Sequence, residues 1–236
     1  MKRHLNWDML VARQTLPGMM RLPSVALQRL DRLFLESWPL RERIRMVGID
    51  IAERAIAYAN AIGALDIGFP IDLENEDMPP RLRREVETAD LIVSTGCVGY
   101  VTERTFSRLA LAMADQQKKP WVASFVLRAV DYSRIARELS RAGLVTEKLE
   151  GVTFVQRRFA DVAEMEATLE ILKRRGVDST FHESRGLMHA EFYLSRPPED
   201  IQKRPLHQLI RVSAGLNKPH QISAETLSGS IIKHPA

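Results

Sequence analysis

From residue 44 onward, short apolar segments alternate with amphipathic helical segments, and this alternation limits the fold more than any other feature. Residues 45–50 read Arg-Met-Val-Gly-Ile-Asp, a strand that ends in a carboxylate, and an alanine-rich helix is expected at 53–62. Further strands are expected at 67–71, 90–94 and 121–127, with helices at 81–88, 103–116 and 133–142. The strand at 90–94 is apolar throughout, which is typical of a buried parallel strand. This order predicts an α/β fold: a Rossmann-like, doubly wound and mostly parallel sheet.

The pattern differs at the two ends of the chain. Residues 144–149 and 189–195 alternate with period two, as strands with one covered face do, and we expect them to form an antiparallel pair. A helix at 161–175, with an acidic start and a basic end, separates them. The predicted organisation is a helical N-terminal segment at 1–43, an α/β domain at 44–197 and a C-terminal tail at 198–236. The tail is expected to be loosely held, with at most one short helix at 206–212.

Composition excludes several classes of function. The 236 residues hold 45% hydrophobic and 27% charged residues, and no apolar run approaches the roughly 20 residues that span a bilayer. Cys97 is the single cysteine, so neither an internal disulfide nor a thiolate zinc cluster is expected. The net charge of +4 is spread along the chain, and its short basic runs lack interleaved aromatic residues. We therefore expect a cytoplasmic protein without a metal, a membrane contact or a nucleic-acid partner.

Asp50 is the most informative single residue. An acid at the carboxyl end of a parallel strand, just before a helix, is well placed to accept hydrogen bonds from both hydroxyls of a ribose. This placement predicts a nucleoside-containing cofactor. A simpler alternative is that Asp50 only caps the helix that follows it.

Three segments together resemble class I S-adenosylmethionine-dependent methyltransferases. The segment Val-Gly-Ile-Asp-Ile-Ala at 47–52 resembles the second strand of that family and the start of its next helix. Residues 69–75, Phe-Pro-Ile-Asp-Leu-Glu-Asn, are similar to its third strand and acidic turn, and residues 89–96 to its fourth strand. The run from Ser94 to Phe106 is similar to one bacterial branch whose substrates are mostly unassigned. The resemblance covers roughly residues 44–197.

The resemblance implies methylation of an unidentified acceptor, most simply a small molecule, with S-adenosylmethionine as the cofactor. It implies that Asp50 binds the ribose hydroxyls and that Ile51 packs against the adenine. Asp72 would accept from the adenine amino group, and the backbone amide of Leu73 would meet a ring nitrogen. The residues that would line the channel where donor and acceptor meet are Thr95 and Gly96. It identifies no catalytic base.

The sequence departs from the family in one respect. The family's first strand ends in a glycine-rich turn that approaches the methionine part of the donor, whereas only Gly18 and Gly48 precede Asp50 here. Either the strand is missing from the chain as given, or donor binding has been lost. A catalytically silent binding or partner protein is therefore the alternative, and the N-terminal helix would then be its docking surface. A nicotinamide-dependent reductase would need a Gly-x-Gly-x-x-Gly turn roughly 20 residues before Asp50.

Other candidate residues have both a functional and a structural interpretation. Tyr100 and Glu103 could contact the acceptor, or they could be a packing residue and a helix-start acid. His182 and His189 could act as acid–base groups, or they could be structural. Cys97 is expected to be a small packing residue rather than a nucleophile. The apolar helical stripe at 25–34 is expected to pack internally, with a lid or an interface between copies of the chain as the alternative.

Overall fold

The structure is a computed structural model that describes residues 18, 21–36, 44–113 and 119–210. Contacts divide the chain into two compact units, Met1–Val86 and Glu87–Ala236. The domain boundaries expected near residues 43 and 197 stay predictions. None of the helices in the described ranges has both the length and the apolar composition that a bilayer crossing requires.

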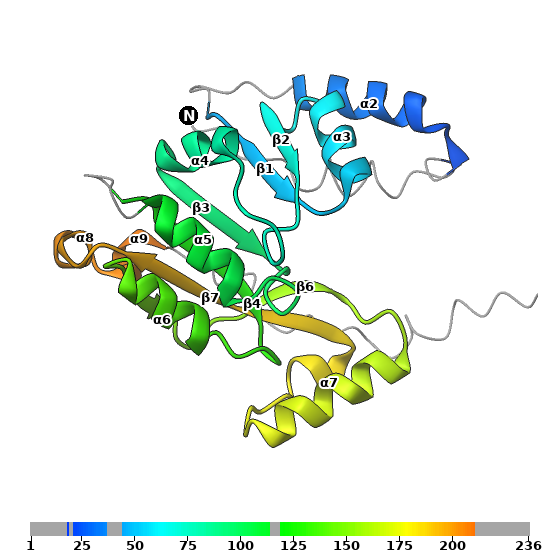
Figure 1. The fold of residues 1–236 in the computed structure, drawn as a ribbon. Helices are drawn as coiled ribbons and strands as arrows, with labels where there is room; N and C mark the ends of the chain where they lie inside the picture. Colours follow the sequence, from blue (N-terminus) through cyan, green and yellow to red (C-terminus); the bar gives the residue numbers. More distant parts are fainter. Residues whose placement is uncertain (1–17, 19–20, 37–43, 114–118, 211–236) are drawn as a thin grey trace, which may run out of the picture. The chain divides into compact units, whose positions relative to one another are not determined.

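The first unit is built around one β–α–β segment (Figure 1). Strands β1 (Val47–Asp50) and β2 (Ile67–Pro70) pair in parallel, and α3 (Glu53–Ala61) connects them. Gly68 is required where α3 crosses β2, because a Cβ at this position would lie 2.6 Å from a methyl group of Ile56. The unit also contains α2 (Ser24–Glu36) and α4 (Pro80–Glu87), the latter ending one residue beyond the division. The N-terminal helix, strands and connecting helix expected from the sequence are thus confirmed.

The second unit holds a five-stranded sheet. Its strands are β3 (Leu91–Thr95), β4 (Trp121–Leu127), β5 (Val145–Lys148), β6 (Phe154–Arg158) and β7 (Leu187–Arg196). The strand order is β3-β4-β7-β5. β5 pairs with residues 193–196 of β7, and β6 pairs with residues 187–190 of β7. Strands β3 and β4 are parallel, whereas β7 is antiparallel to each of β4, β5 and β6. Four strands therefore run in one direction and β7 alone in the other. The predicted fold class, including the antiparallel strand near the C-terminal end, is confirmed.

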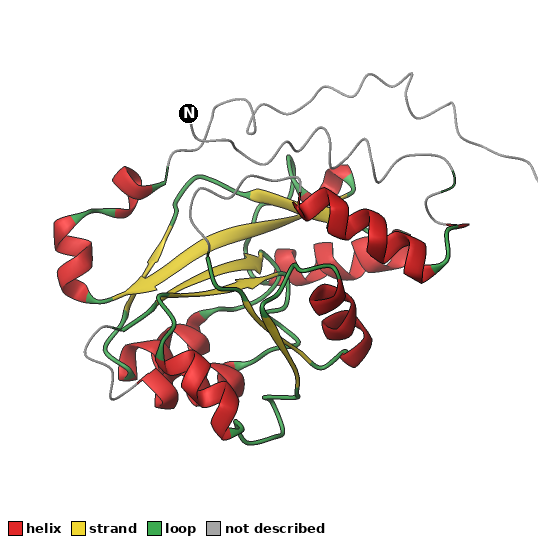
Figure 2. Cartoon of the chain, turned by 90° about the horizontal axis from the view of Figure 1, so that it is seen from above, coloured by secondary structure: helices red, strands yellow, loops and turns green. Residues whose placement is uncertain are grey.

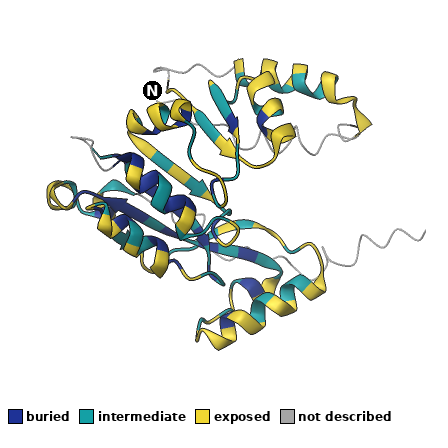
Figure 3. Cartoon of the chain, viewed as in Figure 1, coloured by how far each residue is buried: buried dark blue, intermediate teal, exposed yellow. Residues whose placement is uncertain are grey.

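Helices cover both faces of this sheet. On one face, Tyr132 at the start of α6 (Ser133–Arg141) contacts Ser124 of β4, Tyr193 of β7 and Phe106 of α5 (Glu103–Met113). On the other face, Leu206 of α9 (Leu206–Leu209) joins a core cluster with Ala123, Phe192 and Leu194. Figure 2 shows where the helices and strands lie. Buried residues are concentrated on β4, β7 and α5, as Figure 3 shows for β7 and α5. Between β6 and β7 lie α7 (Val162–Arg174), whose N-cap Asp161 accepts from the Glu164 amide, and the short η2 (Glu183–Arg185).

The expected burial of the strand at 90–94 is wrong. Leu91 is 52% exposed and Val93 is 55% exposed. β3 is an edge strand of the five-stranded sheet and has β4 as its one partner among the described strands. Its apolar composition therefore does not reflect burial on both sides.

The C-terminal segment also differs from expectation. Residues 198–210 carry two short helices, α8 (Pro198–Lys203) and α9, rather than one at most. Proline at the first position suits a helix start, because the missing N–H would be unpaired there anyway. The buried Arg196 guanidinium donates to the carbonyls of Asp200 and Arg204, and the Trp121 indole donates to the Asp200 carboxylate. The segment up to residue 210 is thus held firmly; the rest of the expected tail lies outside the described residues.

Candidate functional site

The first group of predicted site residues lies at the carboxyl end of β1. The Asp50 carboxylate is exposed, and its Oδ1 accepts from the Ala52 amide at 2.8 Å, just before α3. This contact closes a turn before α3 and does not cap the helix, because Ala52 is itself the N-cap residue and α3 has no side-chain cap. The simpler alternative, that Asp50 caps α3, is therefore wrong. Oδ2 has no hydrogen-bond partner among the described residues. Ile51 follows with 70% of its surface exposed, so an open carboxylate oxygen and an exposed apolar side chain stand next to each other.

Asp72 lies just beyond the neighbouring strand, at the same edge as Asp50. The Ile71 amide donates to the Asp50 carbonyl, which ties the two strand ends together at 3.1 Å. Asp72 is half-buried and organises its own turn, because its carboxylate accepts from the Glu74 amide and from the Asn75 side chain. Leu73 is buried, at 3% exposure. The structure thus brings Asp50 and Asp72 to one edge, and their ligand roles stay predictions.

The second group lies in the loop after β3. Thr95 is exposed at the end of the strand, and the Gly96 amide donates to the Phe125 carbonyl of β4 at 3.1 Å. Gly96 has φ of +66°, and a Cβ there would lie 3.1 Å from Oε1 of Gln156. Gly99 has φ of +119° and packs against Val130. Both glycines are therefore required by the backbone of a closely packed loop.

Tyr100 and Glu103 follow Gly99 in the chain and lie in different environments. Tyr100 is 83% exposed, whereas Glu103 pairs with Arg134 of α6 at 3.3 Å. Glu103 also lies in the first turn of α5, as its helix-start interpretation predicts. Thr102 accepts from the Arg104 amide and so begins that helix. Cys97 is half-buried. Contact of Tyr100 or Glu103 with an acceptor stays a prediction.

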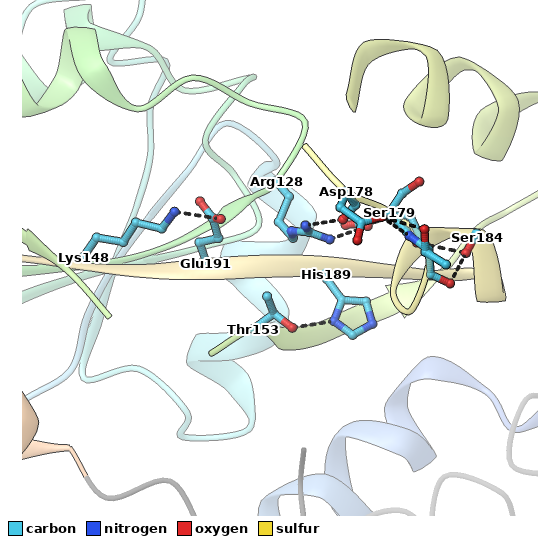
Figure 4. A network of polar contacts seen from close by, with 10 residues as sticks. Arg128, Lys148, Thr153, Asp178, Ser179, Ser184, His189 and Glu191 are labelled. Carbon is cyan, nitrogen blue, oxygen red and sulfur yellow. Dashed lines mark hydrogen bonds and ion pairs between the residues drawn. The ribbon is translucent and has the colours of Figure 1, made fainter. Parts of the chain in front are cut away.

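A buried ion pair lies at the carboxyl edge of the larger sheet (Figure 4). Arg128 directly follows β4, and its guanidinium donates to Glu183 at 2.7 Å and to the carbonyl of Asp178 at 2.6 Å. Both charged side chains are more than nine-tenths buried. Burial is the main cause that raises the pKa of Glu183, and Arg128 opposes it. The pair fixes the turn that carries His182.

Two histidines are packed beside this ion pair. The rings of His182 and His189 are perpendicular, with centroids 4.8 Å apart, and the Nδ1 atom of His189 shares a hydrogen bond of 2.9 Å with the Thr153 hydroxyl. Burial lowers the pKa of His189 to about 4, with His182 and Arg128 adding to the effect. Burial and then Arg128 lower the pKa of His182 as well. Both effects favour the neutral form of the ring.

The sequence identifies the two histidines as candidate acid–base residues, but it does not identify the residues around them. Arg128 could have been suspected, because it is the first residue after a predicted strand and parallel strands present ligands at that end. Thr153 directly precedes β6, and Gln156 lies within it. The sequence does not predict this strand, because Phe-Val-Gln-Arg-Arg lacks clear alternation. Among the described residues no three His, Cys, Asp or Glu side chains are grouped closely enough to hold a metal ion.

Comparisons with known proteins give similarity of structure only. Neither the protein-family models nor the curated protein sequences contain a match. One similar solved structure is the O-methyltransferase of a trans-AT polyketide synthase from Brevibacillus brevis with S-adenosyl-L-homocysteine: 11% identity, TM-score 0.33, covering 73% of this chain and 72% of that one. Another is a plantazolicin methyltransferase with a desmethyl analogue and S-adenosylhomocysteine: 11% identity, TM-score 0.33, 80% and 89% coverage. A precorrin-6y C5,15-methyltransferase from Geobacter metallireducens has 10% identity, a TM-score of 0.29, and 72% and 88% coverage. Similarity at this level assigns no residue a role.

Proposed function

We propose that this chain transfers a methyl group from S-adenosylmethionine to an acceptor. The observation that carries the proposal is Asp50, an exposed carboxylate with one oxygen open at the carboxyl end of β1 in a β–α–β segment. This is where α/β sheets bind nucleosides, and a carboxylate there accepts from a ribose diol. The three similar solved structures are methyltransferases, two of them in complex with S-adenosylhomocysteine.

The residues at this edge fit the adenosine half of the donor. Asp50 would hold the ribose hydroxyls, and the exposed Ile51 side chain would cover one face of the adenine. Asp72 would accept from the adenine amino group, since each carboxylate oxygen keeps a lone pair beyond its turn contacts. When bound, the donor would supply an electrophilic methyl group. The remaining work of the chain is to place the acceptor in line with it.

Calorimetric titration with S-adenosylhomocysteine tests the proposal. The Asp50→Asn variant keeps the oxygen that accepts from Ala52 but loses the charge, so we expect about 10- to 100-fold weaker binding, as for one charge-assisted hydrogen bond. Glu36→Gln is the matched control, because Glu36 is an exposed acid of the same unit on α2, which carries no predicted site residue. Absence of binding to the wild-type chain at millimolar ligand would reject the proposal.

A catalytically silent binding protein is the second candidate. It is favoured by the absence of a glycine-rich turn upstream of Asp50 and by β1 having β2 as its one partner among the described strands. A stably folded chain that binds a defined partner but no S-adenosylhomocysteine would support this candidate. Methyl transfer by the purified chain would exclude it.

A further inference from the structure

We propose that Asn75 is a positioning residue, which holds the Asp72 carboxylate in the orientation that accepts from the adenine amino group of the donor. This inference rests on the proposed methyl transfer and deepens its donor site. It concerns only the turn that follows β2, and this turn lies wholly within the first unit. The resemblance gives Asp72 and Leu73 a role in this turn, but it gives Asn75 none.

The backbone of the turn is fixed without any ligand. The Asp72 carbonyl accepts from the amide of Asn75 at 3.1 Å and from the amide of Glu76 at 2.7 Å. The Leu73 side chain, at 3% exposure, is buried in the unit. These contacts place the Cα atom of Asp72 at the edge of the sheet. They do not determine how its carboxylate is rotated.

Two further contacts determine that rotation. The Oδ1 atom of Asp72 accepts from the Glu74 amide at 2.9 Å, and its Oδ2 atom accepts from the Asn75 side chain at 2.7 Å. The torsion that turns a carboxylate is soft, so an anchor on one oxygen does not fix the plane of the group. The second anchor fixes the other oxygen and thereby the plane. Since an ionised carboxylate only accepts, this contact comes from the N–H side of the Asn75 amide.

A carboxylate fixed in this way is prepared for an amino group. Each of its oxygens has a further lone pair for a ligand. Ordering a side chain on binding costs free energy, and a side chain that is ordered beforehand removes that cost. Asn75 is exposed and Asp72 is half-buried, so both lie where a ligand can reach them. The contribution of Asn75 therefore applies to a ligand with an N–H donor opposite Asp72, and not to nucleosides in general.

Calorimetric titration of the full chain with two ligands tests the inference. One ligand is S-adenosylhomocysteine, and the other is its analogue with a hydrogen atom in place of the adenine amino group. Asn75→Ala removes the anchor, whereas Asn75→Asp keeps the size of the side chain and replaces the N–H donor by an acceptor. Asn75→Ala is also measured in a chain that carries Asp72→Ala. Glu76→Ala is the matched control, because Glu76 is an exposed residue of the same turn whose side chain has no polar partner among the described residues.

We expect S-adenosylhomocysteine to bind about 3- to 10-fold more weakly to Asn75→Ala than to the wild-type chain, as for one side chain that must be ordered on binding. Binding to Asn75→Asp should be weaker still, because the two carboxylates repel each other. The affinity of the analogue should be equal in the wild-type chain, in Asn75→Ala and in Glu76→Ala. Glu76→Ala should also bind S-adenosylhomocysteine as the wild-type chain does.

Three results would overturn the inference. The first is an unchanged affinity for S-adenosylhomocysteine in both Asn75 variants. The second is an equal loss for the two ligands, which would indicate a general role of Asn75 in the turn. The third is a loss in Asn75→Ala that persists in the chain carrying Asp72→Ala, because Asn75 would then contact the ligand itself. A wild-type chain that binds neither ligand would instead reject the proposed function.

Discussion

The two units of the chain differ in whether they bury charged side chains: among the described residues, the buried ones all lie in the second unit. In the first unit, the Arg45–Glu85 pair is on the surface, with 62% of the Arg45 side chain exposed, and the Asp50 carboxylate is also exposed. In the second unit, Arg128, Glu183 and Arg196 are buried among apolar side chains. Charges of the first kind are available to a ligand, whereas charges of the second kind hold segments of the fold together. The Asp50 carboxylate, which is proposed to bind the donor, belongs to the first kind.

Removal of the buried guanidinium should give the largest effect. Arg128→Met leaves Glu183 buried without its counter-charge, which is expected to lower the free energy of unfolding by about 3–5 kcal/mol. Urea denaturation measures the loss, and hydrogen exchange should show it in peptides from 178–190. Arg45→Met, which removes the exposed ion pair, should change little. Equal losses of unfolding free energy in Arg128→Met and Arg45→Met would show that the buried and the exposed ion pair contribute equally to stability.

Truncation of an apolar side chain in the second unit should give the next largest effect. Leu206→Ala removes a side chain that is 7% exposed and packs on β4 and β7. A loss of about 2–4 kcal/mol in the free energy of unfolding is expected. Leu22→Ala, at a 37% exposed position, serves as the contrast. A loss below about 1 kcal/mol would mean that α9 is not part of the core.

A smaller effect is expected where α3 crosses β2 in the first unit. Gly68→Ala places a Cβ 2.6 Å from Ile56, so either the helix or the strand must shift. Overpacking of this kind costs about 1–3 kcal/mol. Hydrogen exchange should rise in peptides from 47–70 and stay unchanged in peptides from β4 and β7. A rise in both sets would show that the two units unfold together.

The smallest effect is a pH dependence confined to the second unit. The pKa of His189 is about 4 in the folded chain and 6.5 in the absence of its environment, so the unfolded chain binds the proton first. The stabilising contribution is complete above pH 6.5 and is lost as the pH falls toward 4. Solvent screening of this half-buried ring limits the loss to about 1 kcal/mol. Denaturation midpoints are measured across this pH range. They should depend less steeply on pH in His189→Gln than in the wild-type chain, and an equal dependence would contradict the prediction.

The sequence predicts local elements well, because each depends on its own side chains. The strand at 121–127 is confirmed with both of its bounds, since an apolar run is flanked by Pro120 and Arg128. Burial is a different matter, because it depends on which neighbours a strand finds. Leu91 and Val93 look like core residues in the sequence, yet β3 lies at an edge.

The candidate site shows the same division. The position of Asp50 at the end of a strand follows from local pattern and is confirmed. The Arg128–Glu183 contact joins residues 55 positions apart, and only the pairing of β4 with β7 brings them together. No local pattern contains that information. The histidines could be named from the sequence, but their pairing could not.

The buried Arg196 has a practical consequence for anyone who shortens this protein. Its guanidinium binds Glu147 and the carbonyls of Asp200 and Arg204, and it stacks on Trp121. A chain that ends at the Pro197-Pro198 pair, where composition alone suggests a boundary, would lose the two carbonyls that accept from this buried guanidinium, although Glu147 would remain. It would also expose the apolar side chains that Leu206 covers. Such a fragment should be insoluble on expression, and a shortened chain should keep all residues up to Ile210.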